Sequence, residues 1–250
     1  MQDTKPVLHN REAFEEILRD YTVSDRAKAV LATTPFVALS SVAGGGRNTI
    51  INYLVEHYDY GFIVSDTTRP PKFRDGKMEQ DGVNYYFRSE EDLLSDLKNG
   101  EFIEAEIIHN QQVSGTSIRE VERIVSTGKV PIHDYEFGGT NAVAAAKPDA
   151  AIIGVLPPNY DEWMRRLTGR ETMDAQELHN RLLTAEKVLE NMLSKPYFAF
   201  VINNTVEQCA AAVDQIVKHP GTDSRDAIAA HGIATELLSR VKETLALENN

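Results

Sequence analysis

The sequence predicts an α/β fold in which helices cover both faces of a mostly parallel sheet. Four apolar runs of strand length, at residues 36–40, 129–134, 150–156 and 198–203, alternate with longer stretches of helical periodicity. Short continuous apolar runs are typical of strands buried on both faces, as in a parallel sheet covered by helices. The first run ends in a glycine-rich turn at residues 41–46, and a helix-length stretch follows it.

The amino-terminal part of the chain is polar and mostly helical in pattern. Phe14, Ile17 and Leu18 recur at i, i+3 and i+4, the spacing of one helical face. Ser24 is a suitable N-cap for a second helix, which Pro35 ends. Further along, we expect a strand at residues 60–64 and helices at residues 48–57, 90–99 and 117–127, the last two closed by Gly100 and Gly128.

The carboxy-terminal part continues the helical pattern, at residues 161–169, 174–195 and 206–218. A polar linker then leads to a further helix at residues 227–248, on which four apolar side chains form a stripe: Leu237, Leu238, Val241 and Leu245. Such a stripe needs a cover, which is either the core of the same chain or a partner. A homodimer through the terminal helices is one form of the second case.

The composition restricts the class of protein. The 250 residues carry a formal net charge of −12 without a run rich in Lys and Arg, which disfavours nucleic acid as a ligand, because phosphate neutralisation dominates that affinity. No apolar run approaches the roughly 20 residues that cross a membrane, and residues 1–17 lack the apolar centre of a signal peptide. A single cysteine, Cys209, fits a reducing compartment. We therefore expect a cytoplasmic protein that binds neither nucleic acid nor membranes.

Three short segments combine hydroxyls, a guanidinium, phenols and a carboxylate. Residues 65–71 read SDTTRPP, residues 81–87 read DGVNYYF, and residues 100–104 read GEFIE. An arginine can hold phosphate oxygens through two parallel donors, and serine and tyrosine hydroxyls can complete the phosphate shell. A carboxylate accepts from a base edge with two adjacent N–H groups, as guanine has. The segments together indicate a site for a small molecule with a phosphate at one end and such a base at the other.

The glycine-rich turn lies where a phosphate-binding loop is expected, between a strand and a helix. The usual pattern is Gly, four residues, then Gly-Lys-Ser/Thr. Here Ser41 stands at the first glycine, Arg47 at the lysine and Asn48 at the hydroxyl that holds magnesium. Three consecutive glycines preserve the backbone that cradles phosphates, while Arg47 keeps a cation and Asn48 offers a neutral carbonyl oxygen. Thr49 would serve instead only if the start of the helix were shifted.

In their order and spacing, these segments resemble the guanylate kinase family over about residues 36–217. The resemblance implies a P-loop kinase fold with a small GMP-binding subdomain at about residues 65–117 and a helical lid at about residues 160–186. The chain would then consist of a helical extension at residues 1–34, a guanylate-kinase-like domain at residues 35–218, and a linker with a carboxy-terminal helix at residues 219–250.

The resemblance also implies roles for individual residues. The GMP phosphate would meet Ser65, Arg69, Lys72 and Tyr85, with Lys72 in place of a second arginine and Ser114 in place of a second tyrosine. Guanine would be read by Glu104, Thr116 and Glu136. ATP would lie against Gly44, Gly45, Gly46, Arg47, Asn48, Thr49 and Asn203, and magnesium against Asn48 and Asp134. Three lid arginines, Arg166, Arg170 and Arg181, would join Arg47 in neutralising charge on the transferred group.

The activity that the resemblance implies is ATP-dependent phosphorylation of GMP to GDP, with Mg²⁺ as cofactor and ATP as co-substrate. Two alternatives stay open. A non-catalytic guanylate-kinase-like module for GMP binding or interaction is favoured by the altered loop, whereas the lid arginines and Asp134 favour an enzyme. A kinase for another nucleoside monophosphate is disfavoured by Glu104 and Glu136, because both carboxylates suit guanine.

Overall fold

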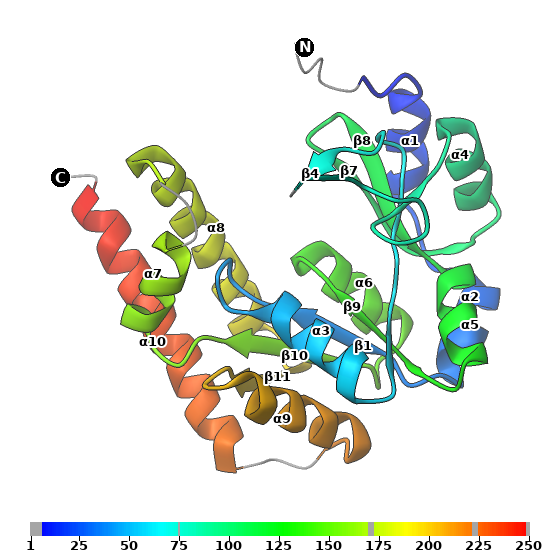
Figure 1. The fold of residues 1–250 in the computed structure, drawn as a ribbon. Helices are drawn as coiled ribbons and strands as arrows, with labels where there is room; N and C mark the ends of the chain where they lie inside the picture. The colour runs from blue at the N-terminus through cyan, green and yellow to red at the C-terminus, as the bar shows by residue number, and fades with distance from the viewer. Residues whose placement is uncertain (1–6, 75, 170–172, 222–224, 249–250) are drawn as a thin grey trace. The chain divides into compact units, whose positions relative to one another are not determined.

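The computed structural model describes residues 7–74, 76–169, 173–221 and 225–248 (Figure 1). The chain divides into two compact units. The first comprises Met1–Thr34, Gly61–Pro131 and Ala145–Lys147, and the second comprises Pro35–Tyr60, Ile132–Ala144 and Pro148–Asn250. The units therefore interleave along the sequence.

The larger sheet has five strands in the spatial order β11-β10-β1-β9-β2. β1 pairs in parallel with β9 and with β10, and β10 pairs in parallel with β11. This mostly parallel sheet confirms the predicted fold class. The strands are Val37–Ser40 (β1), Tyr60–Phe62 (β2), Val130–Asp134 (β9), Ala151–Leu156 (β10) and Phe198–Ile202 (β11).

β1 holds the central place in this sheet, and all four of its residues are buried. The consecutive strands β9 and β10 lie on opposite sides of β1. In open α/β sheets, ligands bind beyond the carboxyl ends of the strands at the point where the connections diverge in this way. The glycine-rich turn at residues 41–46 begins at that end of β1.

The helices of the second unit largely match the predicted ones, with one addition. α9 packs against α3 and β11, and α10 packs against α8 and β11. The sequence does not predict α6, because Gly138 and Gly139 oppose a helix. Gly139 is required by packing, since a Cβ there would lie 2.3 Å from the ring of Tyr135. The helices are Arg47–His57 (α3), Phe137–Ala146 (α6), Tyr160–Thr168 (α7), Ala175–Ser194 (α8), Val206–Lys218 (α9) and Arg225–Glu248 (α10).

The predicted stripe on α10 is covered by the same chain. Leu237, Val241 and Leu245 are buried, and Lys242 Nζ forms an ion pair of 2.6 Å with Glu190 of α8. The cover is therefore the core of the chain itself. A homodimer through the terminal helices stays a prediction, and on α10 it would have to use exposed side chains such as Ile228.

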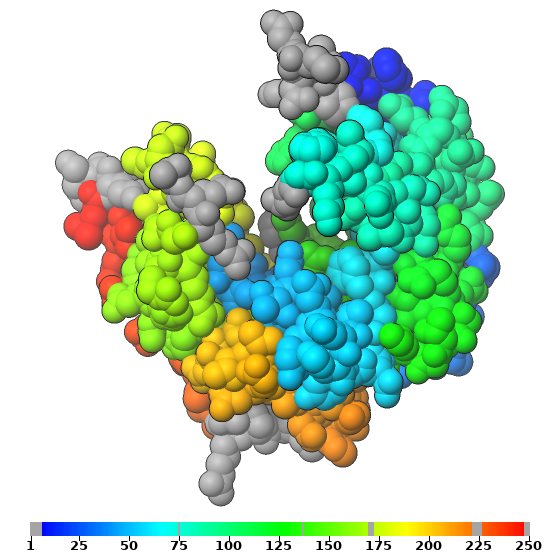
Figure 2. All heavy atoms as spheres, in the orientation of Figure 1, coloured from blue at the N-terminus to red at the C-terminus, as the bar shows by residue number. Residues whose placement is uncertain are grey.

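The first unit contains a four-stranded sheet in the order β6-β3-β8-β7. β7 and β8 form an antiparallel hairpin that the sequence does not predict, and its turn places His109 and Asn110 at positive φ. The β4–β5 hairpin, cyan in Figure 2, lies at the surface and leaves the side chain of Phe73 exposed. The strands are Asp66–Thr67 (β3), Phe73–Arg74 (β4), Lys77–Met78 (β5), Tyr86–Phe87 (β6), Phe102–Ile108 (β7) and Gln112–Ser117 (β8).

The predicted amino-terminal helices pack on this unit. α1 contacts α4 and β7, and Phe14 of α1 lies in a core cluster with Leu93 and Phe102. Ser24 caps the second helix as predicted, since its side chain accepts a hydrogen bond from the backbone N–H of Ala27. The helices are Arg11–Arg19 (α1), Asp25–Ala32 (α2), Glu90–Lys98 (α4) and Ile118–Ser126 (α5).

Within the described residues, no helix combines the length and the apolar character needed to cross a membrane.

The carboxy-terminal helix should contribute to the stability of the second unit. Leu237→Ala should lower the free energy of unfolding by about 2–5 kcal/mol, because the side chain is 1% exposed and its removal leaves a cavity. Leu247→Ala on the same helix is the matched control and should change it by less than about 0.5 kcal/mol, because Leu247 is 76% exposed. Urea denaturation followed by circular dichroism measures both values, and equal effects would contradict the packing described.

Candidate functional site

The phosphate loop joins β1 to α3 and depends on its three glycines. Gly44 and Gly46 have φ values of 81° and 97°, a region that side chains with a Cβ rarely adopt. A Cβ on Gly45 would lie 2.0 Å from the hydroxyl oxygen of Ser41. The turn therefore needs glycine at all three positions, and its close approach to Ser41 is part of its conformation.

Two side chains from neighbouring elements and one from the loop itself hold this loop in place. Trp163 of α7 is fully buried, and its Nε1–H donates to the carbonyl oxygen of Ala43 at 2.7 Å. Asn203, directly after β11, donates from Nδ2 to the carbonyl oxygen of Gly45 at 3.0 Å. Ser41 Oγ donates to the carbonyl oxygen of Val155 at 2.7 Å. The serine thus fixes the loop to β10. The predicted contact of Asn203 with ATP stays a prediction.

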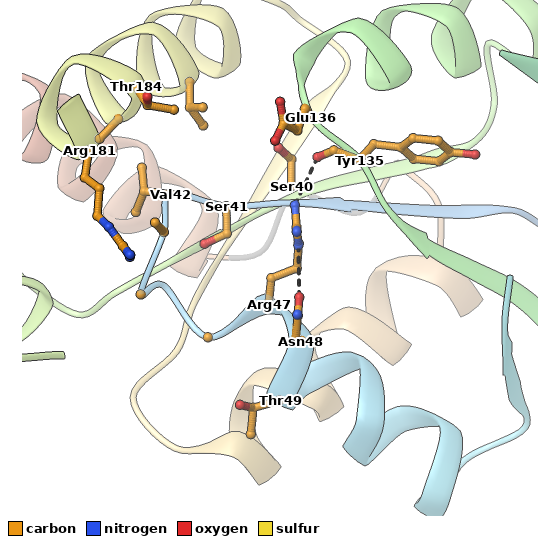
Figure 3. Close-up of a pocket in the computed structure, with 15 residues that line it drawn as sticks. Ser40, Ser41, Val42, Arg47, Asn48, Thr49, Tyr135, Glu136, Arg181 and Thr184 are labelled. Atoms are coloured by element: carbon orange, nitrogen blue, oxygen red, sulfur yellow. Dashed lines mark hydrogen bonds between the residues drawn. The ribbon is translucent and has the colours of Figure 1, made fainter. Parts of the chain in front are cut away.

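Arg47, the first residue of α3, points to the end of β9. The parallel register sets Asp134 beside Leu39, so the carboxylate lies next to the start of the loop. Arg47 Nη2 donates to Asp134 Oδ2 at 2.6 Å, and Nη1 donates to the carbonyl oxygen of Tyr135 at 3.3 Å. Nε lies 3.4 Å from Asn48 Oδ1 and donates to it (Figure 3). The cation that replaces the usual lysine is therefore held on three sides.

The loop borders a cavity of about 350 Å³. Arg181 and Glu136 contribute to its wall, so it holds side chains predicted for both nucleotides (Figure 3). Arg181 also forms an ion pair of 2.6 Å with Glu177 one turn earlier on α8. The wall consists of Ser40, Ser41, Val42, Ala43, Gly44, Gly46, Arg47, Asn48, Thr49, Tyr135, Glu136, Arg181, Thr184, Ala185 and Val188.

Arg166 takes part in holding the loop region. Its Nε donates to Glu162 at 2.8 Å, and its Nη2 donates to the backbone carbonyl oxygen of Asn203 at 3.2 Å. Both bonds reduce the freedom of the guanidinium, which the sequence predicts as a lid cation. Arg170, the third arginine predicted for the lid, lies outside the described residues.

The two residues predicted to hold magnesium do not fit that role in this structure. Asp134 and Asn48 both direct a side-chain oxygen at the guanidinium of Arg47. A magnesium ion on either of these oxygens would stand beside the fixed positive charge of Arg47. Mg²⁺ keeps several waters and binds mainly to substrate phosphates and one or two carboxylates, so a metal carried by the nucleotide needs no site of this kind.

In the first unit, Arg69 is buried and held by a carboxylate. Its side chain is 4% exposed, and its two terminal nitrogens each donate to one oxygen of Glu79, Nη2 at 2.8 Å. The pairing lowers the pKa of Glu79 to about 2. The guanidinium also lies 4.6 Å from the ring centre of Tyr85. The guanidinium of Arg69 is thus held by Glu79 and Tyr85.

The other predicted phosphate ligands of this unit are less buried. Lys72 is exposed, and Tyr85 and Ser65 are half-buried. Ser114, which stands where a tyrosine is usual, donates from its hydroxyl to Thr67 Oγ1 at 2.8 Å. Its hydroxyl is thereby turned to β3, and no ring replaces the missing tyrosine at this position.

Glu104 and Thr116 form a pair across the β7–β8 hairpin. They are partners in the antiparallel register, and Thr116 Oγ1 donates to Glu104 Oε1 at 2.7 Å. Burial raises the pKa of the Glu104 carboxyl to about 7, the bond from Thr116 opposes the shift, and the charge of Glu106 adds to it. The Glu104 residue is half-buried, and one of its carboxylate oxygens is bonded to Thr116.

Sequence reasoning misses Glu79, although the sequence contains a signal for it. The dipeptide Asp-Gly at residues 75–76 is typical of a two-residue hairpin turn. Such a turn pairs Phe73 with Met78, and Glu79 then lies opposite Lys72, whose backbone N–H donates to Glu79 at 2.9 Å. Recognition of the hairpin would have brought this carboxylate to the segment that holds Arg69.

The geometry defines an α/β protein with a phosphate loop after its central strand, and comparison with known proteins identifies the family. The family model for guanylate kinase matches residues 33–220. The chain belongs to the guanylate kinase family.

Several guanylate kinases are similar to the chain at about 30% identity. The guanylate kinase of Rhodococcus jostii is 32% identical over 207 residues, which are 82% of this chain and 97% of that protein. Guanylate kinase 1 of Arabidopsis thaliana is 31% identical over 79% of this chain, which spans only 50% of the plant protein. The crystal structure of guanylate kinase from Anaplasma phagocytophilum has a TM-score of 0.55 at 22% identity, covers 76% of this chain and 88% of its own, and supports the fold.

The Arg69–Glu79 pair should contribute to the free energy of unfolding. Glu79→Ala should lower the free energy of unfolding by about 3–5 kcal/mol, because it leaves a buried guanidinium without its carboxylate. Glu177→Ala, which breaks the half-exposed pair with Arg181, is the control and should cost at most about 1 kcal/mol. Denaturant titration at pH 7 measures both. Because the pKa of Glu79 is lowered, its contribution is present above about pH 4.3 and is lost as the pH falls toward about 2.

Proposed function

We propose that this chain is a guanylate kinase that transfers the γ-phosphoryl group of ATP to GMP and releases ADP and GDP. The observation that carries the proposal is the acceptor segment, in which Arg69 is fixed by Glu79 and Glu104 is paired with Thr116. A preset guanidinium suits a monophosphate, and a preset carboxylate suits the N–H edge of guanine. Membership of the guanylate kinase family supports the same reaction.

GMP would bind by both of its ends in the first unit. Arg69 can still offer Nε and one N–H of Nη2, since Nη1 donates to Glu79 and to the carbonyl oxygen of Pro70. Those donors form one edge of the guanidinium, which can meet two phosphate oxygens. Lys72, Tyr85 and the hydroxyl of Ser65 complete the proposed phosphate shell. Glu104 and Thr116 would read guanine, whereas Glu136, the other carboxylate predicted for the base, lies in the second unit.

ATP would bind at the phosphate loop of the second unit. The backbone of Gly44, Gly45 and Gly46 and the start of α3 favour an anion, while Thr49 and Asn203 are further proposed contacts. Arg47 and Arg181 line the cavity and would neutralise charge on the transferred group, together with Arg166 and Arg170. The acceptor is already an ionised phosphate, so the reaction needs positioning and charge neutralisation more than a general base. Magnesium, the proposed cofactor, would add positive charge on the phosphates of ATP.

The second candidate function is a module that binds GMP without turnover. The observation that favours it is the ion pair between Arg47 and Asp134, which engages the cation and the acid that an enzyme would direct at ATP. In either case, the proposed ligands are nucleotides, and the proposed location is the cytoplasm. The two functions differ in whether ADP is released.

A coupled assay of ADP release with ATP, magnesium and each nucleoside monophosphate decides between them. We expect turnover with GMP and far less with AMP, CMP or UMP. Glu104→Gln should reduce kcat/KM for GMP by about ten-fold or more, because a charge-assisted hydrogen bond contributes about 1.5–3 kcal/mol. Lys77→Gln, an exposed change of the same unit, is the control. GMP binding without ADP release would favour the module, and equal rates with all monophosphates would contradict the role of Glu104.

GMP affinity should depend on pH through Glu104. With a pKa of about 7, the carboxyl is mostly neutral at pH 6 and mostly ionised at pH 8, and only the ionised form accepts from both guanine donors. Affinity should therefore rise by about ten-fold from pH 6 to pH 8. A phosphate monoester also titrates near pH 6, so Glu104→Gln is the control that keeps the phosphate and lacks the carboxyl. Calorimetry with both proteins should give a steeper pH dependence for the unchanged chain.

A further inference from the structure

The contacts of Arg47 use part of its hydrogen-bonding capacity and leave part of it. A guanidinium has five N–H donors. Toward the described residues, three of them are engaged, by Asp134, by the carbonyl oxygen of Tyr135 and by Asn48. One donor on each terminal nitrogen is left. The side chain is 22% exposed and lines the cavity beside the loop, so these two donors can reach a ligand there.

We propose that Asp134 and Asn48 are positioning residues that aim Arg47 at a nucleotide phosphate, and that they are not ligands of the metal. The inference rests on the proposed function and concerns the same site. Asp134 Oδ2 is 2.6 Å from Nη2, the length of a strong charge-assisted hydrogen bond. Its other oxygen lies 3.9 Å from Nδ1 of His133, and the carboxylate is only 27% exposed.

The two departures from the usual loop pattern then have one explanation. A lysine is a point charge on a flexible stem, whereas a planar guanidinium can bond a carboxylate and a phosphate at the same time. Asn48 supplies an oxygen to Nε, which a lysine does not have. Arginine at position 47 and asparagine at position 48 therefore suit each other, and Asp134 completes the support from the neighbouring strand.

The pair also removes the reason to expect a metal at Asp134. The carboxylate charge is balanced by a cation at hydrogen-bond distance, and Mg²⁺ demands near-ideal octahedral geometry and gives up its water reluctantly. A magnesium ion bound to the nucleotide phosphates does not need this oxygen. Loss of Asp134 should therefore affect nucleotide binding equally in the presence and absence of magnesium.

The test measures binding of a fluorescent ADP analogue to the full chain, once with EDTA and once with excess Mg²⁺. Asp134→Ala should weaken binding by about ten-fold in both conditions, because Arg47 loses its orientation. Asp134→Asn keeps an acceptor for Nη2 of Arg47 and should weaken binding of the analogue less than Asp134→Ala does. In an Arg47→Ala background, Asp134→Ala should cause no further weakening, since the residue would then have nothing to position.

Three results would overturn the inference. Weakening confined to the Mg²⁺ condition would identify Asp134 as a metal ligand, and tighter binding with EDTA would show that the pair competes with the nucleotide. Equal weakening in the Arg47→Ala background would exclude an action through Arg47. Thermal melts show whether each variant is folded. If the Asp134 variants are unfolded, Arg47→Lys is the second test. It keeps the positive charge at position 47, and it should also weaken binding of the ADP analogue with EDTA.

Failure of the proposed function gives a different result. An unchanged chain that binds no ADP analogue in either condition would contradict ATP binding altogether, and the inference would fall with it. An unchanged chain that binds the analogue and phosphorylates GMP, while Asp134→Ala matters only with Mg²⁺, would leave the proposed function standing and overturn the inference alone.

Discussion

In each unit, a carboxylate holds in place the arginine that we propose as a phosphate contact. Glu79 holds Arg69 in the first unit, and Asp134 holds Arg47 in the second. An isolated guanidinium would lose rotational freedom only on binding, which weakens affinity. The carboxylates order the two guanidinium groups when the protein folds, so a ligand that binds them would cause a smaller loss of conformational entropy.

Support for these pairs extends into the surrounding structure. In the first unit, Asp66, one residue after Ser65, is fully buried and bonds Arg88 and Arg119 at 2.8 and 2.9 Å. Glu120 of α5 is also fully buried, and accepts from the backbone of Val64. Buried carboxylates are tolerated only when paired in this way. They fix strand β3 at the start of the SDTTRPP segment, and hence the backbone from which Arg69 extends.

The sequence was sufficient for features that depend on local pattern and insufficient for those that depend on distant packing. β1, the glycine loop and Asp134 at the end of β9 could be predicted from apolar runs and spacing. α6 could not, because Gly138 and Gly139 are unfavourable locally and Gly139 is required only by its approach to the ring of Tyr135. The partnership of Arg47 with Asp134 joins residues 87 positions apart, and it follows from the sheet register rather than from either segment. The family resemblance supplied the roles of these residues but not their partners.

The packing of α10 on α8 has a mechanical consequence. Arg181 lies in the first half of α8, whereas Glu190, which binds Lys242 of α10, lies in the second half. A helix is stiff along its length, so a brace at one end limits how far the other end can swing. In enzymes whose turnover is set by the opening of a lid, such a brace acts on the rate without touching a substrate. By the same reasoning, a substitution in the carboxy-terminal helix would change how freely α8 moves, and with it the position of Arg181.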